Sequence, residues 1–417
     1  IDINNLYGWA LSQSLPCGEF CWVLDGFDKI MDECRNLNLE SLSYGYTLEV
    51  DLVIPSELHD KLDDFPVAAE KMKPAGSKVE KLLLTHLPKS NYVIHWKLLN
   101  LYLELGVKVT HVNRGVRFKQ SPIFKKYIDT NTELRSKSIN NLDKNYYKLL
   151  NNSLYGKTVE NLKRRMNLRL CTTAGKLVKY SSKPTFKKSI KIDDNLIAAL
   201  LNSDSICLDR PSYIGQSVLD LSKLRMYELQ YKDLESFRNE FNCKINIVAG
   251  DTDSFFLEVI NCKLEVLLPA MIRDNLLDTS NYNSCHSLYS KNLDSVIGKF
   301  KDENKGLKYK EWVFLRPKCY SLLGDEETKK AKGVTLKGSD IKHQSYLDCY
   351  NTNQIFSVPQ TKITSKNHQI FTIKNTKIAL TNKDDKRVWV GKNTSLAYGH
   401  VRLSELNIGE IVGEEFD

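Results

Sequence analysis

The feature that most constrains this chain is a polar turn between two apolar runs rich in β-forming residues. The runs cover residues 245–248 and 255–260, and the turn between them reads Gly-Asp-Thr-Asp-Ser at residues 250–254. This pattern predicts a β-hairpin, in which the glycine permits a close backbone approach at the bend. The hairpin tip would therefore carry Asp251 and Asp253 on a stiff support.

Two carboxylates fixed at one point repel each other unless a cation lies between them. Hard oxygen ligands favour Mg²⁺, which proteins usually share with substrate phosphates. Aspartate also favours turns for local reasons, so the Asp-x-Asp pattern alone is more often a solvated turn than a metal site. Other parts of the chain must decide between the two interpretations.

Composition places the chain among ordinary globular proteins. It has 417 residues, 41% hydrophobic and 27% charged, which suits two or three packed units. The net charge of +9 is compatible with a polyanionic partner. The sequence contains no apolar run near the ~20 residues that span a membrane, and we expect no membrane partner.

Cysteine spacing excludes two further classes. The ten cysteines are scattered, and the close pair Cys17 and Cys21 has no matching second pair, so the cysteines predict neither a zinc site nor a disulfide framework. Reduced thiols are typical of an intracellular compartment. The sequence starts at Ile1-Asp2-Ile3, within a strand-like segment, and we expect a fragment whose N-terminal part is missing.

The first half of the chain alternates strands and helices. Asp2 would lie at the end of a short first strand, where a metal ligand is held rigidly, followed by helical spacing from Leu6. Alternation of apolar side chains at Leu48, Val50 and Leu52 predicts a strand at 44–55. Residues 56–92 are polar and contain three prolines, which favours a loosely structured insertion. A helix at 93–105 and a strand at 107–118 follow.

Two helices, at 123–134 and 139–155, form the second informative stretch. Leu142, Tyr146, Leu149, Leu150 and Leu154 would make an apolar stripe on the later helix, which we expect to end at a glycine stop at Gly156. Another face carries Lys144, Lys148, Asn152 and Tyr155, with Lys137 on nearly the same line. Such lysines repel mildly, so the row is either a solvated face or a grip on a triphosphate.

The second half contains weaker signals. A strand at 166–170, a turn at 172–175 and a basic run at 183–191 suggest a small hairpin subdomain. Helices are expected at 217–237 and 264–277, and a strand at 312–315. Lys318 and Tyr320, two residues apart, would face the same side of a strand, as a grip on a nucleic-acid phosphate and sugar or as a common surface pair.

Four of these segments together resemble the motifs of family B DNA polymerases, in the family's order. Asp2-x-x-x-Leu-Tyr7 resembles motif A, Lys148-x-x-x-Asn-Ser-x-Tyr-Gly156 resembles motif B without a gap, Asp251-Thr-Asp-Ser254 matches motif C, and Lys318-x-Tyr320 matches the primer-gripping motif. Asn5, Gly8 and Gly250 depart from the family pattern. Segments 127–133, 151–161, 298–303 and 315–318 further resemble the protein-primed polymerases of Polinton (Maverick) elements and related viruses.

The resemblance implies an α+β fold of the right-hand type, with palm, fingers and thumb and an antiparallel palm sheet. It implies a C-terminal polymerase region that begins at motif A. The implied divisions are palm at 1–55, 93–120 and 211–322, insertion at 56–92, fingers at 121–161, an insertion hairpin subdomain at 162–210 and thumb at 323–417.

The resemblance also implies the roles of individual residues. Asp2, Asp251 and Asp253 would be catalytic, with Asp251 as a supporting carboxylate, and Asp2, Ile3 and Asp253 would hold two Mg²⁺ ions, for which Mn²⁺ can substitute. The nucleotide would contact Tyr7, Lys137, Lys144, Lys148, Asn152 and Tyr155. The DNA would contact Ser153, Gly156, Lys318 and Tyr320.

The activity so implied is DNA-directed nucleotidyl transfer from dNTPs to a 3′-hydroxyl, in replication of a mobile element or virus. Its partners are a DNA template and primer, dNTPs and a terminal priming protein, and its location is intracellular, in the nucleus or at a viral replication site. One alternative is a nucleotide-sugar glycosyltransferase that binds a metal diphosphate through Asp251-Thr-Asp253, with a parallel Rossmann-like sheet. Another is a non-catalytic nucleic-acid-binding relic.

Overall fold

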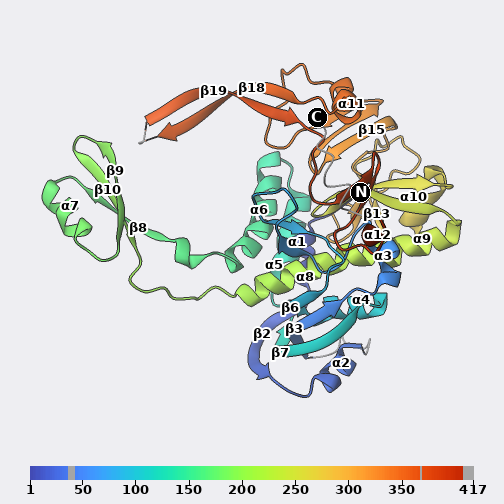
Figure 1. Cartoon of the computed structure of the whole chain (residues 1–417), viewed down its shortest axis with the longest axis horizontal. Helices are drawn as coiled ribbons and strands as arrows, with labels where there is room; N and C mark the ends of the chain where they lie inside the picture. Colours follow the sequence, from blue (N-terminus) through green and yellow to red (C-terminus); the bar gives the residue numbers. More distant parts are fainter. Residues whose placement is uncertain (36–42, 367–368, 407–417) are drawn as a thin grey trace.

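The computed structural model describes residues 1–35, 43–366 and 369–406. Its centre is a five-stranded sheet in the order β11-β12-β1-β14-β13, seen near the N-terminus in Figure 1. The strands are β11 (Lys244–Asp251), β12 (Ser254–Ile260), β1 (Asp2–Ile3), β14 (Phe300–Lys301) and β13 (Leu277–Asp278). Neighbours are antiparallel except for the parallel pair β13–β14. The predicted hairpin is confirmed, and the first strand lies beside it.

Helices close one face of this sheet. The expected helix at 217–237 is longer, comprising α8 (Ser212–Glu228), a π-helical turn η4 (Leu229–Asp233) and α9 (Leu234–Phe241), and α10 (Leu264–Arg273) also covers the sheet. Buried side chains from strands and helices join in one core, among them Ile3, Leu229, Phe237, Phe255 and Phe300. The short strand β1 is therefore fixed by packing as well as by its hydrogen bonds.

A second antiparallel sheet has the order β2-β7-β3-β6. It comprises β2 (Leu15–Val23), β7 (Lys108–Ser121), β3 (Tyr44–Val53) and β6 (Lys89–His95), beside α2 (Phe27–Arg35) and α4 (Trp96–Leu105). The helix expected at 93–105 is α4, and it starts at Trp96. Residues 93–95 instead complete β6, and His95 caps α4. Its end at Gly106 is confirmed, with a left-handed φ of 100°.

Residues 56–92 are more ordered than their polarity predicted. They form η2 (Ser56–Leu58), α3 (His59–Leu62), β4 (Glu70–Met72), β5 (Lys81–Leu83) and the start of β6. Leu62, Val67, Ala68 and Leu83 are buried. The prediction of a loose segment was wrong because short elements and the stretches between them bury apolar side chains, Leu62 in α3, Leu83 in β5, and Val67 and Ala68 between α3 and β4.

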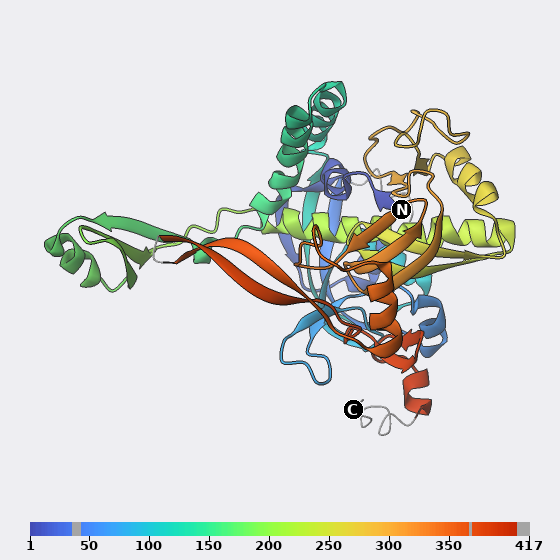
Figure 2. The ribbon, with the colours of Figure 1, turned by 90° about the horizontal axis from the view of Figure 1, so that it is seen from above.

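Two helices stand away from the body in Figure 2. They are α5 (Lys125–Lys137) and α6 (Asn141–Thr158), next to α1 (Leu6–Ser12). The predicted apolar stripe is wrong as a packing surface, since Leu142 and Leu149 are 78% and 63% exposed. The predicted glycine stop is also wrong: α6 continues through Gly156, where an added Cβ would meet nothing within 4 Å, to Thr158.

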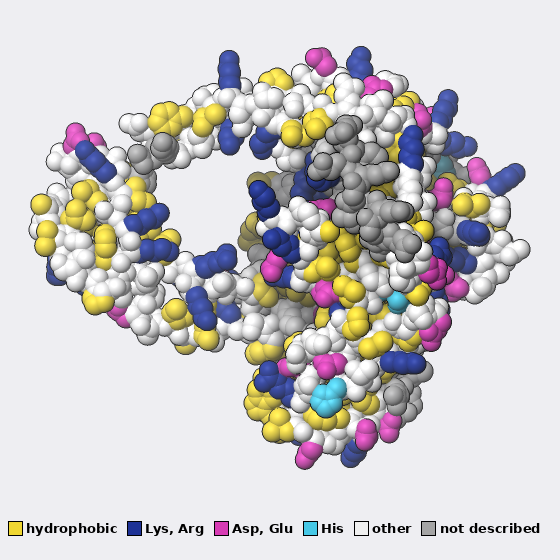
Figure 3. All heavy atoms as spheres, in the orientation of Figure 1, with side chains coloured by type: hydrophobic (Ala, Val, Ile, Leu, Met, Phe, Trp, Pro, Cys, Tyr) yellow, Lys and Arg dark blue, Asp and Glu magenta, His cyan; other side chains and the backbone are white. Residues whose placement is uncertain are grey.

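Two arms extend from the body. One contains η3 (Leu162–Arg164), β8 (Met166–Cys171), α7 (Ala174–Ser181), β9 (Phe186–Asp193) and β10 (Leu196–Asn202), and the other is the hairpin of β18 (Phe356–Lys366) and β19 (Gln369–Leu380). The turn expected at 172–175 instead starts α7, which Thr173 caps. The arm ends lie near each other in Figures 1 and 2, and Figure 3 shows an opening between them with Lys and Arg side chains at its border.

The remaining elements follow the central sheet in sequence. They are β15 (Tyr309–Arg316), β16 (Cys319–Gly324), β17 (Glu327–Lys330), α11 (His343–Thr352), β20 (Val388–Gly391), β21 (Thr394–Leu396) and α12 (Arg402–Glu405). Strands β15–β17 form an antiparallel sheet that packs against α11. Among the described residues, no helix has the length and apolar character needed to cross a membrane.

Candidate active site

Asp2, on the first strand, meets Asp253, in the turn between β11 and β12. Asp2 lies opposite Ser254 in the β1–β12 register, and the N–H of Ile3 donates to the carbonyl of Asp253 at 2.8 Å. Thr252, between Asp251 and Asp253, holds a left-handed φ of 61°, which a β-branched residue rarely adopts. Strain of this kind concentrates at functional sites. The tight turn places Asp253 beside Asp2.

The site holds more negative charge than its surroundings neutralise. Burial raises the pKa of Asp2 to about 7, with further increases from the charges of Asp253 and Glu303. Burial also raises the pKa of Asp253, as does the charge of Asp251. Lys148 acts in the opposite direction on both carboxyl groups. Partly buried carboxylates that repel each other are the donor set that a hard divalent cation satisfies.

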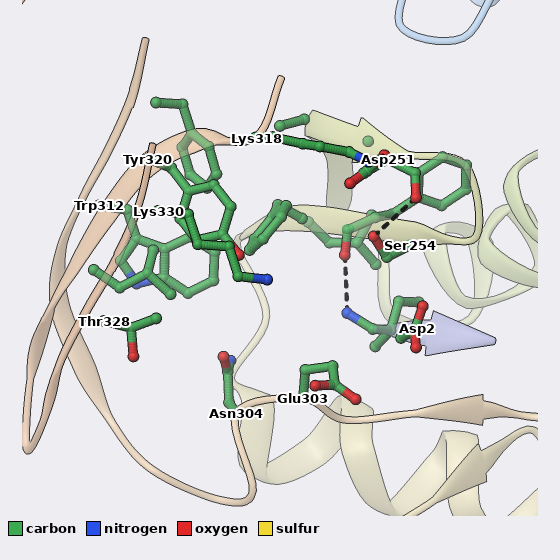
Figure 4. Close-up of a pocket in the computed structure, with 18 of the residues that line it drawn as sticks. Asp2, Asp251, Ser254, Glu303, Asn304, Trp312, Lys318, Tyr320, Thr328 and Lys330 are labelled. Atoms are coloured by element: carbon green, nitrogen blue, oxygen red, sulfur yellow. Dashed lines mark hydrogen bonds and ion pairs between the residues drawn. The ribbon is translucent and has the colours of Figure 1, made fainter. Parts of the chain in front are cut away.

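A pocket of about 980 Å³ opens beside these carboxylates. Figure 4 shows Asp2, Asp251 and Ser254 on one side and Trp312, Tyr320 and Lys330 on the other. Sequence reasoning did not assign a role to Glu303, although it lies in a segment that carried the resemblance. Its acidity and its position just after β14, the neighbour of β1, are the signals that could have found it. Lys330 offered no sequence signal.

Lys318 and Tyr320 reach the pocket differently from the prediction. Lys318 occupies the β15–β16 turn with a left-handed φ of 62°, so the expectation that both residues face one side of a strand was wrong. The Lys318 ammonium lies 3.3 Å from Asp251 Oδ1. The ring centroid of Tyr320, on β16, lies 4.9 Å from that of Phe256. The Lys330 ammonium lies 5.7 Å from the ring centroid of Tyr320.

The residues of α6 divide into two groups. Tyr155 is half-buried, and its ring stacks on that of Tyr7, with centroids 4.7 Å apart and 3° between the planes. Lys148 acts electrostatically on Asp2 and Asp253, as described above. The other predicted contacts on α6 are exposed on the helix surface, as Lys148 is: Lys144, Asn152, Ser153 and Gly156.

Lys137, the remaining predicted nucleotide contact, lies on α5. Its ammonium pairs with Glu133 one turn earlier on the same helix, and both side chains are exposed. The structure therefore brings Lys148 and Tyr7 within electrostatic range of the carboxylates, stacks Tyr155 on Tyr7, and leaves Lys137 paired with Glu133.

Comparison with known proteins gives a consistent picture of the fold. The chain is 16% identical to Phi29 DNA polymerase in an orthorhombic crystal form, with a TM-score of 0.51, over 91% of this chain and 57% of that one. The same values hold for Phi29 DNA polymerase complexed with primer-template DNA and incoming nucleotides. Its complex with single-stranded DNA is 18% identical, with a TM-score of 0.50 and the same coverage. The chain thus spans 57% of the length of these structures.

No curated protein matches the sequence. A family model described as DNA polymerase type B, organellar and viral, matches residues 1–235, more than half of the chain. This segment contains β1 with Asp2, the helix pair α5–α6 and most of the long helix behind the sheet. The chain belongs to the type B DNA polymerases of organelles and viruses.

Proposed function

We propose that this chain carries out DNA-directed nucleotidyl transfer from dNTPs to a 3′-hydroxyl. The observation that carries the proposal is the meeting of Asp2, on β1, with Asp253, in the turn just before the adjacent antiparallel strand β12, where burial raises both pKa values. Family membership supports the same activity. The chemistry needs a fixed pair of carboxylates at the point where phosphates and a hydroxyl meet.

The carboxylates fit a divalent cation, and Asp2, Ile3 and Asp253 are the proposed ligands of Mg²⁺, with Mn²⁺ as a substitute. When bound, the cations would lower the pKa of the attacking hydroxyl and stabilise the leaving pyrophosphate. Asp251 acts as a supporting carboxylate, since Lys318 lies 3.3 Å from it. Glu303 adds negative charge beside Asp2 and strengthens the attraction for a cation.

The incoming nucleotide is proposed to lie between the carboxylates and α6. Lys148, whose charge already acts on the aspartates, would neutralise the triphosphate, with Lys144 one turn away. Tyr7 would lie under the sugar, and Asn152 and Tyr155 would line the nascent base pair. We leave Lys137 out of this set because its ammonium is paired with Glu133.

DNA is proposed to contact Lys318, Tyr320, Ser153 and Gly156. The exposed surface of α6 around Gly156 leaves room for a close backbone approach. Structures of Phi29 DNA polymerase hold primer-template DNA, in one case with incoming nucleotides. By analogy of fold, we assign the central sheet to a palm, α5–α6 to fingers and 323–417 to a thumb, and the arms with their basic border to contacts with the DNA backbone.

A protein-primed role in the replication of a mobile element or virus rests on the sequence resemblance to Polinton-type polymerases and on the likeness in fold to Phi29 DNA polymerase. The glycosyltransferase alternative requires a parallel Rossmann-like sheet. Its proposed ligands instead lie on an antiparallel hairpin paired to an antiparallel strand. We therefore do not pursue that alternative.

Primer extension tests the proposed function. The purified chain is incubated with a labelled primer–template, dNTPs and Mg²⁺, and the extended product is measured. Asp253→Asn should reduce the rate by roughly a thousandfold or more, as expected when an electrostatic contribution of about 4 kcal/mol or more is lost. Glu258→Gln is the matched control, because Glu258 is exposed on the same hairpin and bonds Asn246. Equal rates for Asp253→Asn and wild type would refute the proposal.

A further inference from the structure

A compact histidine–carboxylate cluster lies between α3 and the C-terminal segment that surrounds β21. Asp63 follows α3, His86 precedes β6, and His400 follows β21. One ligand atom from each of the three lies within 4.8 Å of the others. His86 and His400 are each only 2% exposed. Three metal-ligating side chains from three distant segments thus converge in a buried place, separate from the polymerase carboxylates.

The ring nitrogens of His86 have no hydrogen-bond partner among the described residues, and both are buried. His86 Nε2 lies 3.8 Å from Asp63 Oδ1, too far for a hydrogen bond. A buried polar group without a partner typically costs about 1–3 kcal/mol, and an imidazole always carries at least one donor or acceptor that needs one. A buried histidine whose ring nitrogens have no hydrogen-bond partner, close to a carboxylate, indicates a place where a further ligand can bind.

The neighbouring histidine shows what a satisfied ring looks like in the same place. His59 stacks on His86 with ring centroids 4.4 Å apart. Its Nε2 bonds the carbonyl of Ile54 at 3.1 Å, and its Nδ1 accepts the N–H of Val401 at 2.9 Å. Both ring nitrogens of His59 have hydrogen-bond partners, so His59 packs against the cluster and is not one of its ligands.

We propose that Asp63, His86 and His400 form a binding site for one divalent transition-metal ion of the Zn²⁺ type, which fastens the C-terminal segment to residues 56–92. Two imidazoles and one carboxylate suit Zn²⁺, whereas Mg²⁺ and Ca²⁺ take all-oxygen sets. Three protein ligands leave one tetrahedral position, which goes to water.

Surrounding contacts are those expected around such a site. His400 Nε2 lies 3.3 Å from Asp60 Oδ1 and has no hydrogen bond among the described residues, so a second buried ring nitrogen lacks a partner beside a carboxylate. The other nitrogen of His400, Nδ1, accepts the N–H of Arg402 at 3.2 Å. Asp63 is oriented by the N–H of Ala397, which donates to its Oδ1 at 2.9 Å, while Oδ2 pairs with Arg387.

The position of the site gives it a structural role. Lys81 pairs with Asp385, Arg402 pairs with Asp60, and the amide of His86 bonds the carbonyl of Tyr398 at 2.8 Å. All of these contacts join residues 56–92 to residues 385–402. A metal bound in their midst would lock the two segments together, and its binding free energy would add to the stability of the chain.

Zinc binding is measured on the full chain after removal of metal with a chelator. The stripped protein is titrated with Zn²⁺ in excess Mg²⁺, which occupies the polymerase carboxylates, and both stoichiometry and thermal stability are followed. We expect about one equivalent of Zn²⁺ and a melting temperature that rises with Zn²⁺ concentration. Co²⁺ in its place should give the visible absorption of a tetrahedral site.

His86→Leu is the decisive variant, because an apolar side chain of similar size removes the unpartnered nitrogens and permits folding. It should lose Zn²⁺ affinity by more than the roughly hundredfold typical of changes to outer contacts, and lose the thermal shift. His111→Leu, at an exposed histidine, is the matched control, and Asp253→Asn should retain the bound Zn²⁺.

Two results would overturn the proposal. One is wild-type protein that takes up no stoichiometric Zn²⁺, which would leave the histidine cluster as a packing contact without a metal. The other is a folded His86→Leu protein that binds Zn²⁺ as wild type does. If His86→Leu does not fold, the stoichiometry of wild type and Asp253→Asn decides: retention in both supports the site, and its absence in both refutes it.

Discussion

Tyr7 and Tyr155 stack ring on ring, with centroids 4.7 Å apart and planes inclined by 3°. Tyr7 lies on α1 beside the carboxylates, and burial and the charge of Asp253 both raise its pKa. Tyr155 lies on α6, which also carries Lys148. The stack therefore joins α1, which follows β1 and its Asp2, to α6, the helix proposed to face the nucleotide.

Tyr7→Val should relax selection against ribonucleotides. In the proposed pose, the Tyr7 ring excludes a 2′-hydroxyl, and a clash of this kind is typically worth a few kcal/mol, or about a hundredfold. The measurement is the ratio of kcat/KM for a deoxynucleotide and its ribonucleotide with Mg²⁺. Tyr7→Phe keeps the ring and the stack, so it should keep the wild-type ratio. An unchanged ratio in Tyr7→Val would show that Tyr7 is not the sugar gate.

Lys148→Ala and Lys137→Ala should behave differently. Lys148 acts on Asp2 and Asp253 through its charge, whereas Lys137 is paired with Glu133 and exposed. We expect Lys148→Ala to lower kcat/KM for dNTPs by roughly a hundredfold, equivalent to about 2.7 kcal/mol. Lys137→Ala should stay within about twofold of wild type. Similar losses in both variants would indicate that Lys137, Lys144 and Lys148 all bind the triphosphate.

The raised pKa of Asp2 predicts a pH effect with a definite sign. Because its pKa is about 7 in the folded chain against 3.8 ordinarily, the folded state retains a proton that the unfolded state releases. Without metal, this group's contribution to stability should fall as pH rises from about 4 through 7, and stay level above. Asp2→Asn should flatten that slope in denaturant titrations made with a chelator present.

The raised pKa of Asp2 should also make Mg²⁺ binding depend on pH. The ion binds ionised carboxylates, so its apparent affinity should fall roughly tenfold per pH unit below 7 for each proton released. Calorimetric titrations in buffers of different ionisation enthalpy would count that proton at pH 6. Release of no proton at pH 6 would contradict the raised pKa.

Local sequence pattern predicted the hairpin at 244–260 well, because strand alternation and a Gly-Asp turn are short-range signals. The same reasoning failed for α6. Its leucines have helical spacing, but spacing alone does not show whether another element covers them, and Leu142 is 78% exposed. The meeting of Asp2 with Asp253 followed only from the family resemblance, since strand pairing across most of the chain leaves no local signal.

The histidine cluster had no sequence signal either. Asp63 and His86 come from the predicted insertion at 56–92 and His400 comes from the implied thumb at 323–417, and their spacing matches no short metal-binding motif. Only the return of residues 385–402 onto residues 56–92 brings them together. Contacts of this kind depend on tertiary packing, which overrides local preference.

Gly298→Ala should destabilise the protein by about 2–5 kcal/mol. Gly298 has a φ of +76°, and an added Cβ would lie 2.2 Å from Trp9 Cδ1. A left-handed backbone costs about 1–2 kcal/mol for a residue with a Cβ, and overpacking adds about 1–3 kcal/mol. The same loop leads into β14 and Glu303, and the amide of Gly298 bonds the carbonyl of Asn4 at 2.8 Å. Displacing it would also disturb the carboxylate site.

Gly333→Ala separates the backbone cost of Gly298→Ala from its packing cost. Gly333 has a similar φ of +73°, but an added Cβ would meet nothing within 4 Å. Its substitution should therefore carry only the backbone cost of about 1–2 kcal/mol. Denaturant midpoints of both variants give the comparison. If Gly298→Ala were no less stable than Gly333→Ala, Trp9 would have room to move, and the close contact between the Gly298 loop and α1 would not be what positions Glu303 beside Asp2.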